Sequence, residues 1–267
     1  MIANPHRTAS AGTQAIARAA ALLRALATHG QTGYRLADLA RQLQMERPTV
    51  HRILRRLVEE RLVEQDPRSR RYRLGPLIYE LGLVVEPPAA LRDCWDASLD
   101  TLAQHSGDTV FVHVTSSLDS VCIDRREGSY PVKALLLSVG RRRPLGTGAG
   151  SLAMLATLPA GEAERILEAN RVRLAMLGET DPDDLLRRIE QGRRDGYVMK
   201  HPLDMQEILS VAVAVQDPMG RPTMALSISA LTYRIRDRAD MLLPLLQREA
   251  RAVAHRLGQH PGVGLAA

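Results

Sequence analysis

The chain has 267 residues and a mass of 29.4 kDa, with 45% hydrophobic and 25% charged residues. These values are ordinary for a globular protein and exclude extensive disorder. No stretch approaches the roughly 18 consecutive apolar residues that a membrane span needs. Cys94 and Cys122 form neither a CxxC motif nor a disulfide framework, and residues 1–13 lack the apolar core of a secretory signal. We therefore expect a cytoplasmic protein with a flexible tail over residues 1–13.

Positive charge is concentrated at one end of the chain. Residues 1–85 carry 14 arginines against 7 acidic residues, a net charge of +7, whereas residues 86–267 carry 22 basic and 23 acidic residues, a net charge of −1. A basic segment ahead of a neutral body indicates contact with a polyanion such as DNA. A solvated basic surface is the alternative, and charge alone leaves both open.

The basic segment is predicted to hold three helices. Apolar residues recur every three or four positions over 14–28 and over 36–43. After a turn at 44–45, the apolar positions from Val50 to Val58 fit a third helix, with Pro48 in its first turn. The opposite face presents polar and basic side chains, namely Arg47, Thr49, His51, Arg52, Arg55 and Arg56. This order is typical of a helix-turn-helix, in which the second helix enters the major groove of DNA.

A hairpin is predicted directly after the third helix. Residues 62–65 and 72–74 read as strands around a turn that Asp66-Pro67 opens. Its tip carries Arg68, Ser69, Arg70 and Arg71. A hairpin in this position is typical of the wing of a winged helix, which contacts phosphates. We expect the first four residues of the polar helix face (Arg47, Thr49, His51, Arg52) to read base edges, and Arg55, Arg56 and the hairpin tip to bind phosphates.

The body is predicted to be an α+β domain. Helices are expected at 91–105, 146–158, 182–195 and 237–257, and strands at 109–116, 120–125, 132–137, 210–216 and 223–229, with a tight connection at 217–220. No regular β-α-β alternation is present, which favours an antiparallel sheet flanked by helices. Residues 77–88 read as a linker helix whose apolar side chains favour pairing with a second copy of the chain.

The sequence predicts no catalytic site, cofactor or metal site. The glycine-rich stretch 146–151 lacks the lysine of a P-loop and does not form a GxSxG elbow. The histidines lack metal-ligand spacing, and His113 lies in a predicted strand, where a packed histidine is more common than a ligand. Arg141, Arg142 and Arg143 are interpreted as a surface or dimer contact.

Residues 15–258 resemble the IclR family of bacterial transcriptional regulators. The matching motifs are LADLA at 36–40, TVHRIL at 49–54, YRLG at 72–75, VGRRRPL at 139–145, TGAG at 147–150, LAMLA at 152–156, RRDGY at 193–197, VAVAV at 211–215 and ALSIS at 225–229. Two positions depart from the family: Pro48 replaces a usual Ser or Thr, and Arg61 replaces a frequent Gly that a left-handed conformation would favour. The resemblance implies a winged helix-turn-helix DNA-binding domain at 14–76, a linker helix at 77–88 and a GAF-like effector-binding domain at 89–260.

The resemblance also implies an effector site. The positions that match it are Gly148, Ala149, Ile208, Ser210, Ser227 and Ser229. Backbone N–H groups at a helix N-terminus bind anions, and serines two apart on a strand share one face. Lys200 replaces a common acidic residue and would favour a carboxylate effector if it faces the pocket; solvent exposure is the alternative.

The predicted function is therefore that of a ligand-responsive, sequence-specific transcriptional regulator. Its expected partners are double-stranded operator DNA, a small organic effector and a second copy of the chain, in a homodimer or a dimer of dimers. The alternative hypothesis is a small-molecule-binding enzyme or sensor with a winged-helix module for protein interaction.

Overall fold

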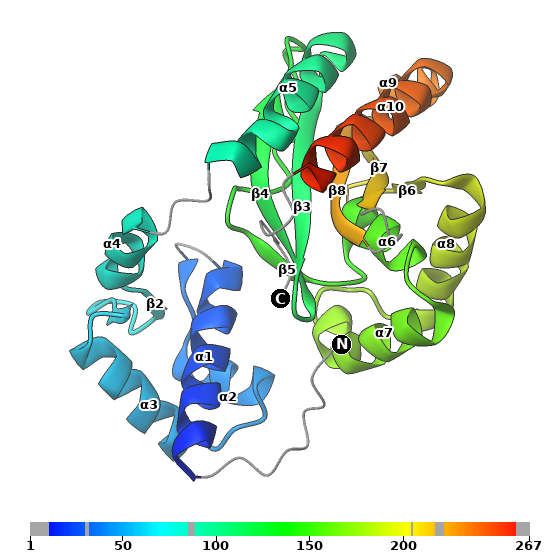
Figure 1. Cartoon of the computed structure of the whole chain (residues 1–267). Helices are drawn as coiled ribbons and strands as arrows, with labels where there is room; N and C mark the ends of the chain where they lie inside the picture. Colours follow the sequence, from blue (N-terminus) through cyan, green and yellow to red (C-terminus); the bar gives the residue numbers. More distant parts are fainter. Residues whose placement is uncertain (1–10, 30–31, 85–88, 204, 217–221, 260–267) are drawn as a thin grey trace. The chain divides into compact units, whose positions relative to one another are not determined.

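The computed structural model describes residues 11–29, 32–84, 89–203, 205–216 and 222–259 (Figure 1). The chain divides into two compact units, residues 1–86 and 87–267. The predicted connection at 217–220, most of the predicted tail and the end of the predicted linker helix (85–88) lie outside the described residues.

The first unit is a helix-turn-helix followed by a hairpin. Its elements are α1 (Ala11–His29), α2 (Leu36–Gln42), α3 (Arg47–Glu59), β1 (Val63–Gln65), β2 (Tyr72–Leu74) and α4 (Pro76–Val84). The three predicted helices and the hairpin are confirmed, although α1 begins at Ala11 rather than at residue 14. Leu26 of α1, Leu39 of α2 and Leu54 of α3 are fully buried in one apolar core, and burying each such side chain contributes about 1.5–3 kcal/mol.

Two non-glycine residues adopt left-handed backbone conformations at the ends of α2 and α3. Gln44 (φ 50°) lies in the turn between α2 and α3, and Arg61 (φ 59°) lies just after the end of α3. At Arg61 the chain turns into β1, while its carbonyl lies so close to Gly75 that a Cβ at Gly75 would be 2.2 Å from that oxygen. The backbone of Arg61 is therefore strained, as expected for an arginine at a left-handed position where the family often has glycine.

The last helix of the first unit, α4, exposes most of its apolar side chains. None of its residues is buried, and Tyr79, Leu81, Leu83 and Val84 are 52–84% exposed. Its start is held by a backbone hydrogen bond from Leu77 N–H to the Arg61 carbonyl and by an ion pair between Arg61 and Glu80. An apolar helix face that the described residues of its own unit leave exposed indicates an interaction surface.

The second unit is a six-stranded antiparallel sheet with helices on both faces. Its strands are β3 (Thr109–Ser116), β4 (Asp119–Glu127), β5 (Arg142–Pro144), β6 (Val198–Lys200), β7 (Ile208–Gln216) and β8 (Pro222–Leu231), in the spatial order β5-β4-β3-β8-β7-β6. Its helices are α5 (Ala89–Ser106), α6 (Gly148–Ala156), α7 (Ala160–Ala175), α8 (Pro182–Asp195), α9 (Thr232–Arg236) and α10 (Ala239–Gly258). The predicted α+β domain with an antiparallel sheet is confirmed.

Both faces of the sheet are covered (Figure 1). Alternate residues of β3, including Val110 and Val112, pack in the core formed with α5 and α10. The opposite face of the central strands β7 and β8 packs on α6, which in turn packs on α8. The prediction of β3 as a half-buried strand is therefore wrong, since its first six residues are all buried.

Several elements differ from the sequence prediction. Residues 132–137 form no strand; Leu136 and Leu137 in this segment line a pocket, while Val132 and Leu135 are exposed. The helices α7 and α9 were not predicted. The strands β5 and β6 were also missed, because three residues are too few to show an alternation of apolar and polar side chains. The prediction of α8 is confirmed: Asp181 accepts a capping hydrogen bond from Asp184 N–H and Gly196 ends the helix at φ 75°. Among the described residues, no helix is long and apolar enough to cross a membrane.

Candidate nucleic-acid interface and ligand pocket

The recognition-helix candidate α3 has one buried and one exposed face. Val50, Leu54 and Leu57 are buried at the spacing i, i+4, i+7, which fixes the direction of the opposite face. The exposed side chains there are Arg47, His51, Arg52, Arg55 and Arg56, and Thr49 is half-buried. The six predicted DNA-contacting residues of this helix are thus brought onto one surface.

The arginines of α3 fall into two groups by their partners. Arg55 pairs with Glu59, and Arg56 pairs with Glu59 and Glu60. For Arg47 and Arg52, the described part of the chain provides neither an ion pair nor a side-chain hydrogen bond. Positive charge is therefore uncompensated at the N-terminal half of α3, the half that meets base edges in a helix-turn-helix.

The hairpin tip is a turn that Asp66 organises. Its Oδ1 accepts hydrogen bonds from Arg68 N–H at 3.0 Å, Ser69 N–H at 2.6 Å and the Ser69 hydroxyl at 2.9 Å. The hydrogen bonds from Ser69 make the largest contribution to lowering the pKa of Asp66. Arg68, Ser69 and Arg70 are exposed at the tip. Arg71 is half-buried and donates to the Gly33 carbonyl at 2.9 Å, so it ties the hairpin to the loop after α1.

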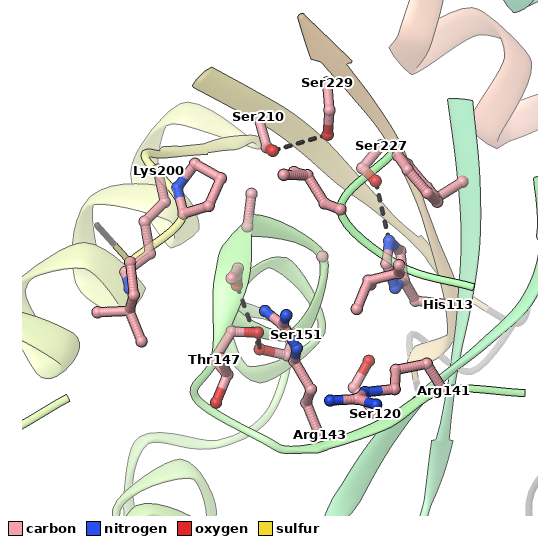
Figure 2. A pocket seen from close by; sticks show the side chains of 18 of the residues that line it. His113, Ser120, Arg141, Arg143, Thr147, Ser151, Lys200, Ser210, Ser227 and Ser229 are labelled. Carbon is pink, nitrogen blue, oxygen red and sulfur yellow. Dashed lines mark hydrogen bonds between the residues drawn. The ribbon is translucent and has the colours of Figure 1, made fainter. Parts of the chain in front are cut away.

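A pocket lies in the second unit between the sheet and the N-terminus of α6 (Figure 2). It encloses about 50 Å³, several times the roughly 10–15 Å³ that one water molecule needs. Six of the seven predicted effector residues line it, namely Gly148, Ala149, Lys200, Ser210, Ser227 and Ser229. The seventh, Ile208, does not line the pocket; it sits at the start of β7, opposite Leu231.

Hydroxyl groups and one imidazole line one end of the pocket. The Ser210 and Ser229 hydroxyls face each other across the β7–β8 pair at 2.7 Å. Ser227 Oγ lies 2.9 Å from His113 Nε2. Burial, with a smaller contribution from Arg143, lowers the pKa of His113 to about 4. The imidazole is therefore neutral at physiological pH, and each pair keeps hydrogen-bonding capacity for a ligand.

Lys200 faces the pocket but is neutralised there. Its ammonium forms an ion pair with Glu179, and both side chains are less than 10% exposed. The pair adds no net charge to the pocket wall. Gly148 opens α6 at φ 80°, where a Cβ would meet no atom within 4 Å. The N-terminus of α6 is therefore open on this side, although the helix has no side-chain cap.

Two arginines that the sequence analysis placed on the surface line this pocket. Arg141 and Arg143 extend into it (Figure 2), and neither has a side-chain hydrogen bond or ion pair within the residues that the structure describes. Burial and the charge of Arg141 lower the pKa of Arg143. Arg142 instead pairs with Asp119 and donates to Ser116. The interpretation of Arg141 and Arg143 as surface residues is therefore wrong, whereas a dimer contact through this segment stays a prediction.

The sequence did hold a signal for these arginines. Positions 141, 142 and 143 run into β5, where successive side chains point to opposite faces, so the first and third share a face. His113 was also missed, because its place among buried valines made a packed histidine the simpler interpretation. His113 does pack, yet it also lines the pocket, as does Thr147, whose buried Oγ1 has no hydrogen-bond partner in the described part of the chain.

The two cysteines do not take part in either site. Cys94 and Cys122 are buried thiols, and burial raises the pKa of Cys122 to about 11. Within the described ranges, no three His, Cys, Asp or Glu side chains come together as metal ligands.

A helix-turn-helix unit with an uncompensated basic helix, joined to a domain with a polar pocket, defines the class of ligand-binding transcriptional regulators. Residues 15–67 match the model of the IclR helix-turn-helix domain, and residues 89–255 match that of the bacterial transcriptional regulator IclR C-terminal domain. The chain belongs to the IclR family. The matched families and relatives are transcriptional regulators rather than enzymes.

Individual relatives agree with this assignment. The chain is 30% identical to the glycerol operon regulatory protein of Streptomyces coelicolor, over 92% of this chain and 96% of that protein. An IclR transcriptional regulator from Alicyclobacillus acidocaldarius has 25% identity and a TM-score of 0.64, over 91% of this chain and 98% of that one. An IclR homolog from Microbacterium hydrocarbonoxydans, solved with 4-hydroxybenzoate, shares the fold at 20% identity and a TM-score of 0.60, over 91% and 98%.

Proposed function

We propose that this chain is a ligand-responsive regulator that binds a specific operator and a small organic carboxylate. The observation that carries the DNA-binding part is the uncompensated positive charge on the N-terminal half of α3. Because its partner is DNA, we assign the protein to the cytoplasm. We retain 14–76 as the DNA-binding domain, 77–88 as the linker helix and 89–260 as the effector-binding domain.

Base reading is assigned to Arg47, Thr49, His51 and Arg52. An arginine that forks on a guanine contributes about 1–3 kcal/mol of discrimination between bases. Phosphate contacts are assigned to Arg55, Arg56, Arg68, Ser69 and Arg70, and the exposed ion pairs of the first two cost little to open. Arg71 contributes by holding the wing in place through Gly33.

The effector is assigned to the pocket of the second unit. Arg141 and Arg143 support a carboxylate ligand, rather than Lys200, whose charge Glu179 already compensates. The open α6 N-terminus adds N–H donors for the same group. The effector changes operator affinity only if it binds two states of the protein differently, since equal binding shifts no equilibrium.

A homodimer is proposed through α4. Its exposed Tyr79, Leu81, Leu83 and Val84 would bury their apolar surface against the same helix of a second copy. A dimer would present two copies of α3 to two half-sites of an operator. Light scattering on the wild type and on Leu83→Glu tests this: we expect a dimer and a shift toward monomer. A wild-type monomer at micromolar concentration overturns the assignment.

The test of the function is a salt series of DNA binding with the full chain. The DNA is the promoter region adjoining its own gene, with unrelated DNA as competitor. We expect tight binding that resists competitor DNA. In a plot of the logarithm of the binding constant against the logarithm of the salt concentration, each neutralised phosphate should make the slope more negative by about 0.9. Weak binding that is indifferent to sequence at every salt concentration overturns the proposal and favours a protein-interaction module.

A further inference from the structure

We propose that the pocket selects a small hydroxylated dicarboxylate, with Arg141 and Arg143 holding its carboxylates. This inference rests on the proposed ligand-responsive function and names the chemical class of the effector. It follows from three features of the pocket: its net charge, the position of its two arginines away from the serines of β7 and β8, and its size.

The charge of the lining residues favours two negative charges on the ligand. Lys200 and Glu179 cancel, and the buried His113 is neutral at physiological pH. The two remaining charged groups in the pocket are the guanidinium groups of Arg141 and Arg143. Among the described residues they form no ion pair or side-chain hydrogen bond, although Glu179 also attracts Arg143. Two half-buried like charges repel each other, and this repulsion is costly unless an anion compensates them. A monocarboxylate leaves one of them uncompensated, and a dianion does not.

Hydroxyl groups occur at both ends of the pocket, since Ser120, Thr147 and Ser151 lie in the same half of the view as the arginines (Figure 2). Arg141 and Arg143 lie at one end, and Ser210, Ser227 and Ser229 lie at the other. In the Ser210–Ser229 pair one hydroxyl donates to the other, so one O–H remains to donate to a ligand. A ligand hydroxyl or keto oxygen fits this end while the carboxylates occupy the other.

A further hydroxyl group points to a polar ligand. Thr147 is 7% exposed and lines the pocket, and its Oγ1 has no hydrogen-bond partner among the residues that the structure describes. A buried hydroxyl without a hydrogen bond costs about 1–3 kcal/mol, which a ligand oxygen would recover. The volume of about 50 Å³ matches only a few water molecules. A space of this size holds one small organic acid.

Calorimetric titration of the full chain with defined acids tests this proposal. Malate has two carboxylates and a hydroxyl, succinate lacks the hydroxyl, 3-hydroxybutyrate lacks one carboxylate, and 4-hydroxybenzoate and inorganic phosphate are further probes. We expect malate to bind at least tenfold more tightly than 3-hydroxybutyrate, with succinate between them. Tighter binding of 4-hydroxybenzoate, or equal binding of phosphate, overturns the proposal.

Variants locate the binding to the two arginines. Arg141→Met and Arg143→Met each remove one cation at similar length, and we expect each to weaken malate at least tenfold, whereas Arg143→Lys retains part of the affinity. Arg171→Met is the matched control, since this exposed arginine of α7 pairs only with Glu168 among the described residues. Unchanged malate affinity in both pocket variants overturns the proposal.

The two proposals fail in different ways. Operator affinity in the absence of acid should be the same for the wild type and for the control variant Arg171→Met, which lies outside both sites. Tight operator binding without binding of any dicarboxylate overturns the assignment of the ligand and leaves the regulatory function standing. Loss of operator specificity in the wild type overturns the function itself. The fluorescence of Trp95, the one tryptophan of the chain, reports whether each variant is folded.

Discussion

The neutral imidazole of His113 should make the second unit less stable in mild acid. Its side chain is buried, and its pKa is about 4 in the folded protein against 6.5 for the free group. Between these values the unfolded chain binds a proton that the folded chain does not, so stability falls as pH falls from 6.5 toward 4. Well above pH 6.5 the imidazole is neutral in both the folded and the unfolded chain, so its titration no longer lowers the stability of the folded protein.

The magnitude follows from the two pKa values. A shift of one unit corresponds to 1.36 kcal/mol, so the shift from 6.5 to about 4 amounts to about 3 kcal/mol in full. Linkage gives a loss of about 2 kcal/mol at pH 5 relative to pH 8. His113→Gln keeps a hydrogen-bonding group near Ser227 and removes the titration, so its stability should lack this part of the pH dependence.

Urea unfolding followed by Trp95 fluorescence measures this difference. Trp95 is buried in the second unit and donates to Asp124 at 3.0 Å, so its signal reports that unit. The difference between the free energies of unfolding of the wild type and His113→Gln should change by about 2 kcal/mol between pH 8 and pH 5, because only the wild type loses stability through this titration. Parallel curves for the two proteins over this range would refute the reasoning, because they would show that His113 binds its proton equally in both states.

Three further predictions concern other sites. Arg52→Ala should weaken operator binding by about 1–3 kcal/mol in a mobility-shift titration without changing acid binding; unchanged operator affinity removes Arg52 from the interface. Asp108→Ala should cost at least about 3 kcal/mol in the same fluorescence titration, because this carboxylate is 1% exposed and pairs with Arg234 and Arg238; a loss below 1 kcal/mol contradicts this. Arg61→Gly should stabilise the first unit by up to about 1 kcal/mol in thermal unfolding by relieving a φ of 59°; a loss would mean that the ion pair with Glu80 outweighs the strain.

The first unit could be predicted from the sequence nearly in full. Its helices are amphipathic, its turns are short, and its contacts connect neighbouring elements, so local periodicity carries most of the information. The exposed face of α3 follows directly from the spacing of Val50, Leu54 and Leu57. What periodicity could not show is which arginines are paired, since the ion pairs of Arg55 and Arg56 depend on side-chain geometry.

The second unit could be predicted in class but not in detail. The strand β3 was located correctly, yet its burial on both faces depends on α6, which is distant in the sequence. The segment 132–137 has the composition of a strand, but its apolar side chains divide between the pocket and the surface. Arg141 and Arg143 were misplaced for a related reason: charged residues are buried only where a pocket requires them, and the pocket is formed by strands that the sequence does not place together.

The order of strands in the sheet also determines when each unit can fold during synthesis. The central strand β3 pairs with β8, so residues 109–116 can complete their strand pairing only after residues 222–231 have been synthesised. The first unit, by contrast, is complete once about 86 residues have left the ribosome. Since domains generally fold as units, N-terminal first, the helix-turn-helix forms while β3 still has an unpaired edge. A chain cut between β3 and β8 would keep its basic helix but expose a buried strand, a state prone to aggregation.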